Sequence, residues 1–253
     1  MTRRLVPALA ALAAGAAILV AATLGSAAAA APSSARSPNK SCSFYVFFNQ
    51  HRSLFRGNTP LRKALNFAVD RTAFAGGATP LTHLLAPRMA GSRSANPFPV
   101  RPNLAKAQEL ASGHLRSGSV RIAYQTEGTN ASANAQLLEQ ELVSLGFDQA
   151  RIEMDGLAGY DLYTTAMAKG APYDLVLGMG MCPASRDSAP VLRSFVDPKS
   201  GWGQYATNSA VYRTKLASIS RRLKGHARFA ALGKLDIEIM RTIAPAVPLS
   251  APK

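Results

Sequence analysis

The chain has few of the side chains that usually bind metal ions. It contains two cysteines and four histidines among 253 residues. The histidines are too scattered for any pair to share a metal ion at the spacing of known zinc motifs: His51, His83, His114 and His226. Cys42 and Cys182 are too few and too far apart for a zinc ribbon. We therefore expect no metal site and interpret each lone histidine as a surface residue.

Residues typical of catalysis are also sparse. No serine stands in a Gly-x-Ser-x-Gly setting, and no glycine-rich phosphate loop follows a strand pattern. Asp161 and Asp174 are carboxylates of the kind that a general acid/base pair needs, but only their nearness in the sequence links them. We expect a protein that is not an enzyme and that needs no cofactor.

The first 31 residues have the order of a secretory signal peptide. Arg3 and Arg4 precede an apolar run over 5–24, and the alanines at 27–31 offer small-residue cleavage sites. The run is also long enough to span a bilayer, so a membrane anchor is the alternative; Pro7 and the alanine-rich end favour cleavage. Residues 32–41 should form a flexible leader. The expected location is extracellular, periplasmic or within the cell envelope.

Basic residues outnumber acidic ones two to one. Lys and Arg number 29 and Asp and Glu 14, a formal net charge of +15. Such an exported protein can make weak contact with anionic polymers or lipids of the cell envelope, although solubility alone explains the charge equally well. Residues 221–228 (RRLKGHAR) form a basic cluster that could contact phosphates. No aromatic residue interleaves it, and positive charge at a helix end complements the helix dipole, so we expect no nucleic-acid partner.

Residues 173–182 (YDLVLGMGMC) are the stretch around which the rest is organised. Five mostly apolar residues from Tyr173 to Leu177 are bounded by Pro172 before and by Gly178 and Gly180 after, which predicts a strand covered on both faces. Glycines at the exit let the backbone approach a ligand. In open α/β sheets, ligands bind at that edge.

The flanking pattern alternates strands with helices. Strands are expected at 43–49, 120–124 and 151–154, with an extended end at 245–249, and helices at 58–75, 104–111, 130–145, 160–169, 190–195, 210–223 and 227–243. On the first helix, the charged residues Arg62, Lys63, Asp70 and Arg71 are interpreted as a solvated face. Residues 79–102 contain five prolines and should wrap the surface as a loop. The succession from 120 to 177 indicates parallel strands with right-handed crossovers.

Five short motifs, in order, resemble family 5 extracellular solute-binding proteins, the peptide and nickel receptors of ABC importers. Residues 61–71 (LRKALNFAVDR) are similar to that family's "vRqAlnyAiDR" helix. The other four motifs are residues 44–49 (FYVFFN), 102–107 (PNLAKA), 173–175 (YDL) and 202–208 (WGQYATN). The resemblance runs from Cys42 to Leu249. It implies an α/β fold with a mixed sheet, helices on both faces and the shape of one lobe of a periplasmic-binding-protein-like clamshell.

The sequence departs from that family in two ways. Family members are longer and have two lobes, whereas this chain resembles only the second. In peptide receptors, the loop after the "yDl" strand commonly reads Trp-Cys-Ala-Asp-Tyr, and its aspartate holds the peptide's amino group. Met181 and Ala184 stand where the tryptophan and the acid would be, and Asp187 is a possible substitute acid. Tyr212 likewise stands where the family's "NpevD" turn has an acid.

The resemblance assigns roles to particular residues. The family often bridges the cysteine of this loop to one near the start of the lobe, which implies a Cys42–Cys182 disulfide. The implied solute contacts are Met181, Cys182, Asp187, Trp202 and Tyr205. We expect amine-dependent peptide binding to be weak because Ala184 replaces the acid.

We therefore expect residues 42–253 to be a single lobe that serves as the solute-binding component of an ABC importer. Its solute would be a peptide or another small molecule, and its partners an ABC permease or a separately encoded first lobe. The alternative is a remnant or interaction module that binds no small solute and pairs with another chain, because half a clamshell exposes the face that meets its partner.

Overall fold

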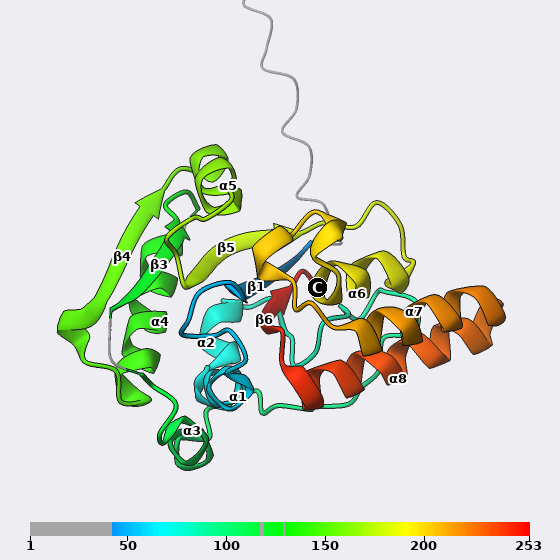
Figure 1. The fold of residues 1–253 in the computed structure, drawn as a ribbon, viewed down its shortest axis with the longest axis horizontal. Coiled ribbons are helices and arrows are strands. Elements are labelled where there is room, and N and C mark those ends of the chain that lie inside the picture. The colour runs from blue at the N-terminus through cyan, green and yellow to red at the C-terminus, as the bar shows by residue number, and fades with distance from the viewer. Residues whose placement is uncertain (1–41, 117–118, 129) are drawn as a thin grey trace, which may run out of the picture. The chain divides into compact units, whose positions relative to one another are not determined.

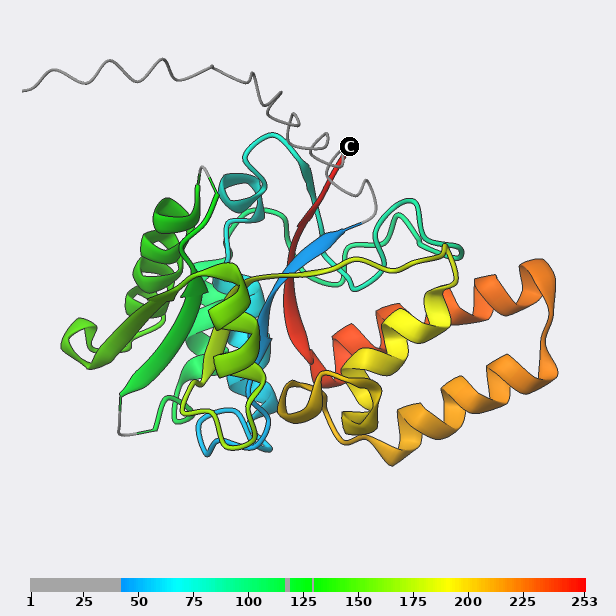
Figure 2. The same ribbon diagram turned by 90° about the horizontal axis from the view of Figure 1, so that it is seen from above.

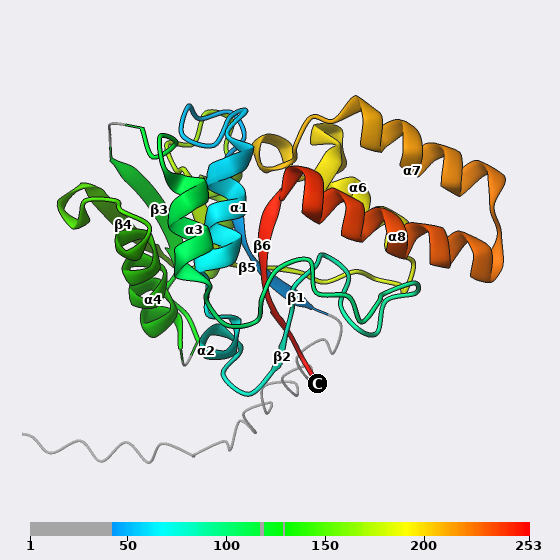
Figure 3. The same ribbon diagram turned by 90° about the horizontal axis from the view of Figure 1, so that it is seen from below.

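In the part of the chain that the structure describes, six strands form one mixed sheet in the order β2-β6-β1-β5-β3-β4 (Figures 1 and 3). The computed structural model describes residues 42–116, 119–128 and 130–253; the expected signal peptide and leader lie outside them. The strands are β1 (Ser43–Phe48), β2 (Thr79–Pro80), β3 (Val120–Gln125), β4 (Ile152–Leu157), β5 (Leu175–Met181) and β6 (Ala246–Ala251). The helices are α1 (Thr59–Ala68), α2 (Arg71–Ala75), α3 (Leu104–Ala111), α4 (Ala131–Ser144), α5 (Gly159–Met167), α6 (Ser188–Val196), α7 (Ala210–Arg222) and α8 (Gly225–Ile243).

The central strand is β5, as the apolar run predicts. It pairs in parallel with β3 and antiparallel with β1, and β3 pairs in parallel with β4, which confirms the strand–helix–strand–helix–strand unit. Its limits differ from the prediction: the strand begins at Leu175 and runs through both glycines to Met181. Antiparallel pairing with β1 explains the extension, because Phe44 lies opposite Gly180 and Ser43 opposite Met181.

Helices cover both faces of the sheet (Figures 2 and 3). Side chains of α5, α6, α7 and α8 pack on one face and those of α1, α3 and α4 on the other. The period-2 alternation of the strands feeds both cores: Val176 points into the first and Leu175 and Leu177 into the second. This two-layer cover is the architecture that the resemblance implied. None of the helices in the described part of the chain is long and apolar enough to cross a bilayer.

The expected solvated face of the first helix is wrong for two of its arginines. Arg62 is 2% exposed and Arg71 is completely buried. Arg62 donates to the carbonyls of Phe55 and Ile243, and Arg71 to those of Pro99 and Pro248. Burial lowers the pKa of both guanidinium groups to about 10, within the range where they stay charged at neutral pH. Each arginine thus joins segments that are far apart in the sequence through hydrogen bonds to their carbonyl groups.

The helix pattern over 58–75 is broken in two. Asn58 caps α1 by accepting from Leu61 N–H, as predicted, but α1 ends at Ala68. Asp70 then caps α2, accepting from the N–H groups of Thr72 and Ala73, and Gly76 ends α2 at φ 52°. A residue without a Cβ adopts that left-handed conformation without strain. The break turns Arg71 inward.

The proline-rich segment 79–102 is also more deeply placed than predicted. Leu84 and Leu85 are completely buried, and Thr79 and Pro80 add an edge strand to β6. His83, expected at the surface, is 6% exposed and lies against Asp236 of α8. Segment 79–102 therefore completes the core and does not run over the surface as a loop, as its prolines had suggested.

Candidate functional site

The sheet has a topological switch point between β3 and β5. From β3 the chain connects to β4 on one side, and the next connection returns from β4 past β3 to β5 on the other side. Ligands of open α/β sheets bind beside the carboxyl ends of the strands at such a point. A hollow of about 270 Å³ lies there, lined by Phe44, Phe74, Ala75, Ala78, Gln125, Glu127, Gly128, Asn130, Ala131, Asn134, Leu177, Gly178, Leu249 and Ser250.

Two glycines create the space for the polar wall of this hollow. A Cβ on Gly178, whose φ is 96°, would lie 2.7 Å from the Cβ of Gln125. A Cβ on Gly159 would lie 2.8 Å from Glu127 Oε2 and 3.1 Å from Gln125 Nε2. Real Cβ atoms essentially never approach within 3.0 Å, so β5 can lie this close to the Cβ of Gln125 because position 178 is glycine. At position 159 the nearest atoms are the ends of the Glu127 and Gln125 side chains, which a Cβ there would displace. The backbone at Gly178 thus lies close to Gln125 of the neighbouring strand. Its expected approach to a ligand stays a prediction.

The main chain of α5 also orients Glu127. The N–H of Gly159 donates to Glu127 Oε2 at 3.2 Å. This N–H belongs to the first turn of the helix, where backbone donors lack intrahelical partners and the helix dipole favours negative charge. The hollow thus presents a carboxylate and the amides of Gln125, Asn130 and Asn134 beside the apolar surfaces of Phe44 and Phe74.

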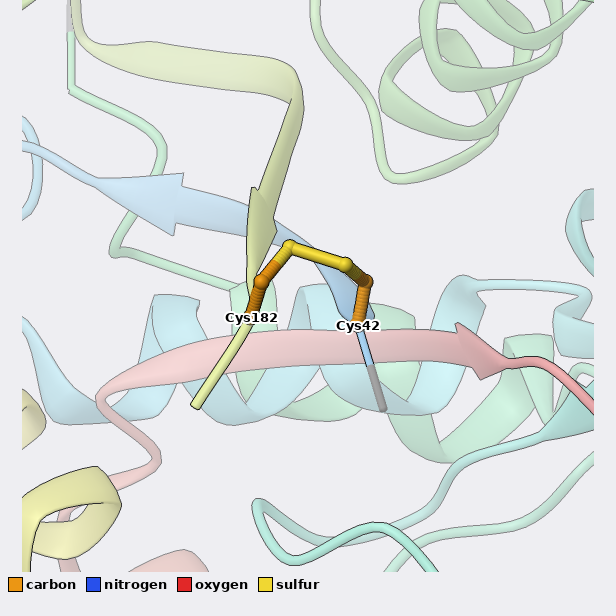
Figure 4. Close-up of a disulfide and its surroundings, with 2 residues drawn as sticks. All are labelled: Cys42 and Cys182. Carbon is orange, nitrogen blue, oxygen red and sulfur yellow. A yellow bond between two sulfur atoms is a disulfide. The ribbon is translucent and has the colours of Figure 1, made fainter. Parts of the chain in front are cut away.

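The implied disulfide is present. Cys42 and Cys182 are bonded, with Cα atoms 4.0 Å apart (Figure 4). The bond joins the residue before β1 to the residue after β5, where the two strands already pair. It therefore ties the start of β1 to the end of its neighbour β5, beside the predicted solute loop. Met181, next to it, is 8% exposed and belongs to the core on the α6 side.

Asp187, the possible substitute acid, already has partners. It accepts from Ala189 N–H as the cap of α6, and Arg228 of α8 donates to it at 2.9 Å. Partial burial alone would raise the pKa of Asp187, but the hydrogen bonds from Arg228 and Ala189 and the nearby positive charge hold it below the ordinary value. A solute amine at this carboxylate would have to displace Arg228.

Trp202 and Tyr205 pack against the sheet. The Trp202 ring stacks on Phe47 with centroids 4.5 Å apart. Tyr205 is 1% exposed, its hydroxyl donates to Ala166 O at 2.8 Å, and burial raises its pKa. Neither residue lines the hollow, nor do Met181, Cys182 and Asp187. Their role in contacting a solute stays a prediction.

Four other residues singled out in the sequence have defined positions in the fold. Ala184 is exposed in the loop after β5, and Tyr212 is buried at 4% exposure in α7. Asp174 is buried and accepts from Arg52 Nε at 2.7 Å and from Arg121 N–H. Asp161 is exposed on α5. Asp174 therefore serves to join β3 and β5 to the loop after β1.

The residues that line the hollow were not among those predicted from the sequence. Gln125 and Glu127 follow a strand that the alternation of 120–124 predicts, and the rule about exit edges applies to that strand as well as to β5. Applied there, it would have selected them. Phe74 and Leu249 carry no comparable signal, because only the fold brings α2 and β6 to this edge.

The fold and part of the sequence match known proteins. Residues 6–201 match the sequence model of the family described as "Bacterial extracellular solute-binding proteins, family 5 Middle". The glutathione-binding protein GsiB of Salmonella choleraesuis (strain SC-B67) is 32% identical over 118 residues, which are 44% of this chain and 22% of that protein. GsiB of Escherichia coli (strain K12) is 31% identical over the same length.

Solved structures show the same architecture. The oligopeptide-binding protein OppAIV of Borrelia burgdorferi superposes with a TM-score of 0.72 at 15% identity, covering 84% of this chain and 43% of that one. DppA of Helicobacter pylori, in complex with peptide STSA, gives 0.68 at 21% identity, covering 83% and 41%. This chain thus spans about a fifth of the GsiB proteins and less than half of these structures. The chain belongs to family 5 of the bacterial extracellular solute-binding proteins.

Proposed function

We propose that residues 42–253 act as one lobe of the extracytoplasmic solute-binding component of an ABC importer. The observation that carries this proposal is the hollow at the switch point between β3 and β5, in a chain of this family. Its wall combines apolar side chains with a few oriented polar groups, as small-molecule sites do. GsiB is a glutathione-binding protein and the DppA structure holds a peptide, which supports a peptide-type solute.

A first lobe, supplied by another chain, would complete the site. Ligand pockets bury most of the surface of a small ligand, which one wall at a sheet edge does not achieve. Tyr160 and Tyr163 begin α5, directly after the carboxyl end of β4, and are 79% and 55% exposed. Large exposed aromatics at one edge are typical of a contact surface. We place the contact with a first lobe here, and that with an ABC permease on the assembled receptor.

The rival function is an interaction module that binds no small solute. The same two tyrosines favour it, because a partner chain could cover them without a solute. Titration calorimetry of the exported chain with short peptides separates the two functions. Heat of binding that saturates at one peptide per receptor supports the solute-binding function. The module would be established instead by two results together. The chain forms a stable complex with a protein that copurifies with it, and no peptide binds to the chain either alone or in that complex.

Export and contact with the cell envelope complete the proposal. Export follows from the charged start and apolar run of residues 1–31. For envelope contact, Arg221, Arg222 and Lys224 are exposed at the turn between α7 and α8, at the far end of a helical hairpin (Figures 1 and 3). None of the three forms an ion pair with another residue in the described ranges. A protruding basic end suits a flat anionic surface better than a groove-bound polymer.

A further inference from the structure

The hollow has a charge opposite to that of the chain as a whole. Lys and Arg outnumber Asp and Glu 29 to 14. The described residues that line the hollow nevertheless include no lysine or arginine and one carboxylate, Glu127. In a strongly basic protein, a hollow with this lining attracts positive rather than negative groups.

Most carboxylates near the two sheet edges and helix ends are already neutralised by a cation. Asp174 pairs with Arg52, Asp187 with Arg228, and Asp155 with Arg121. Glu127 has no cationic partner within 4.0 Å among the residues that the structure describes. Its one recorded hydrogen bond comes from the N–H of Gly159 to Oε2. The remaining acceptor positions of the carboxylate are available to a ligand.

The surroundings of Glu127 suit a cationic group. The side-chain amides of Gln125 and Asn134 line the same hollow, and so does the aromatic ring of Phe44, which is 39% exposed. A carboxylate, amide oxygens and an aromatic ring are the groups that bind ammonium and guanidinium ions. The N–H of Gly159 holds the carboxylate by a hydrogen bond, and a Cβ at this position would displace Oε2.

We propose that Glu127 is the residue that binds the cationic group, an ammonium or guanidinium, of the solute. The inference rests on the proposed solute-binding function. It assigns to the loop after β3 the acid that Ala184 does not supply in the loop after β5 and that Asp187 does not offer because Arg228 occupies it.

The experiment is calorimetric binding of matched peptides to the exported chain. The probes are three peptides. Ala-Lys-Ala carries a lysine ammonium and an amino-terminal ammonium, its analogue with norleucine in place of lysine keeps only the amino-terminal one, and the N-acetylated form of that analogue carries neither. The variants are Glu127→Gln, which keeps an acceptor for Gly159 N–H, and Asp161→Asn, which removes the same charge from an exposed position on α5 outside the hollow's lining. Circular dichroism melts check that both variants are folded.

We expect each loss of a positive charge from the peptide to lower its affinity for the parent protein. The loss of the ammonium group that Glu127 binds should lower the affinity by about 10-fold. Glu127→Gln should abolish that difference, and Asp161→Asn should keep it. Gly159→Ala, which displaces the carboxylate, should also reduce it.

The outcomes separate the two proposals. If the peptides bind with the same preference for charge in the Glu127→Gln variant, the assignment of Glu127 is overturned and the solute-binding function stands. If the three peptides, with two, one and no ammonium groups, bind the parent protein equally well, the assignment is likewise overturned. If none of the peptides binds the parent protein, the proposed function fails and the assignment fails with it.

Discussion

His83 Nδ1 lies 2.7 Å from Asp236 Oδ2, in a part of the core where both side chains are buried. The other ring nitrogen, Nε2, lies 2.8 Å from the carbonyl oxygen of Arg93. A carbonyl and a carboxylate only accept hydrogen bonds, so this arrangement favours the imidazole in which both ring nitrogens donate, which is the positively charged form. Asp236 also accepts from the N–H groups of Leu84 and Leu85. The pair therefore fastens segment 79–102 to α8.

This pair predicts a loss of stability as the pH rises. Burial alone would lower the pKa of His83, but the hydrogen bond and charge of Asp236 and the Arg93 carbonyl raise it above the ordinary value. A folded-state pKa above the unfolded one stabilises the protein fully below about pH 6.5, and this contribution disappears as the pH rises through the folded-state value. Urea unfolding at a series of pH values should show a smaller decline for His83→Gln than for the parent. His226→Gln, at an exposed position, should decline like the parent; an equal decline in all three proteins would contradict the prediction.

Glu141 should add to the same pH dependence. Burial raises its pKa to about 8, against opposing effects of the Asp70 N–H bond and Arg71. Because the folded protein then binds a proton that the unfolded chain releases near pH 4.5, stability falls between these two values. Glu141→Gln keeps an acceptor for Asp70 N–H and does not titrate. The free energy of unfolding of the variant minus that of the parent should therefore be larger at pH 8.5 than at pH 5, by on the order of 3 kcal/mol. Denaturant melts at the two pH values measure this, and Glu139→Gln on the same helix is the control.

Reduction of the Cys42–Cys182 bond should lower stability. The bond closes a loop with a sequence separation of 140 residues, for which the chain-entropy account gives roughly 5 kcal/mol. Thiol titration of the denatured, unreduced protein should find no free thiol. Cys42→Ser/Cys182→Ser should unfold at a lower urea concentration than the parent, and reductant should lower the midpoint of the parent alone. Two titratable thiols in the unreduced protein would refute the bond.

Signal-peptide cleavage predicts a defined amino terminus. Mass spectrometry of the exported protein should find it between Ala28 and Ser33, without a lipid, since no cysteine follows the apolar run directly. A membrane-bound form that retains Met1 would instead establish the anchor.

The basic end of the α7–α8 hairpin should bind anionic lipid. Each basic residue near such a surface contributes about 1 kcal/mol, so replacing three with glutamine should lower partitioning onto phosphatidylglycerol-containing vesicles by at least about 10-fold. Sedimentation with these vesicles compares the variant Arg221→Gln/Arg222→Gln/Lys224→Gln with the control Arg56→Gln/Arg101→Gln/Lys169→Gln. The control removes the same charge from other exposed positions. Equal loss in both variants would mean that net charge alone drives the binding, and competition by a soluble polyanion would indicate a polymer.

Local pattern predicted the strands β3 and β5 and their parallel pairing, but not the limits of β5 or the break between α1 and α2. Asn58 and Asn103 cap helices where their side chains predict caps, because a cap is a contact within four residues. The strand at 120–124 and the run at 173–177 carry their pairing in period and composition. The Cys42–Cys182 bond was implied by the family resemblance, and the structure confirms it.

Tertiary structure decided which charged residues are buried and where the hollow lies. Charge predicts exposure for Arg62, Arg71 and His83, yet each is buried because carbonyl or carboxylate groups from distant segments accept its hydrogen bonds. No local pattern encodes such a partner. Likewise Gln125 and Glu127 become a polar wall only where Gly178 and Gly159, from two other segments, leave room for them. The sequence determined the elements and their caps, and the long-range hydrogen bonds and close backbone approaches that form only on folding determined the site.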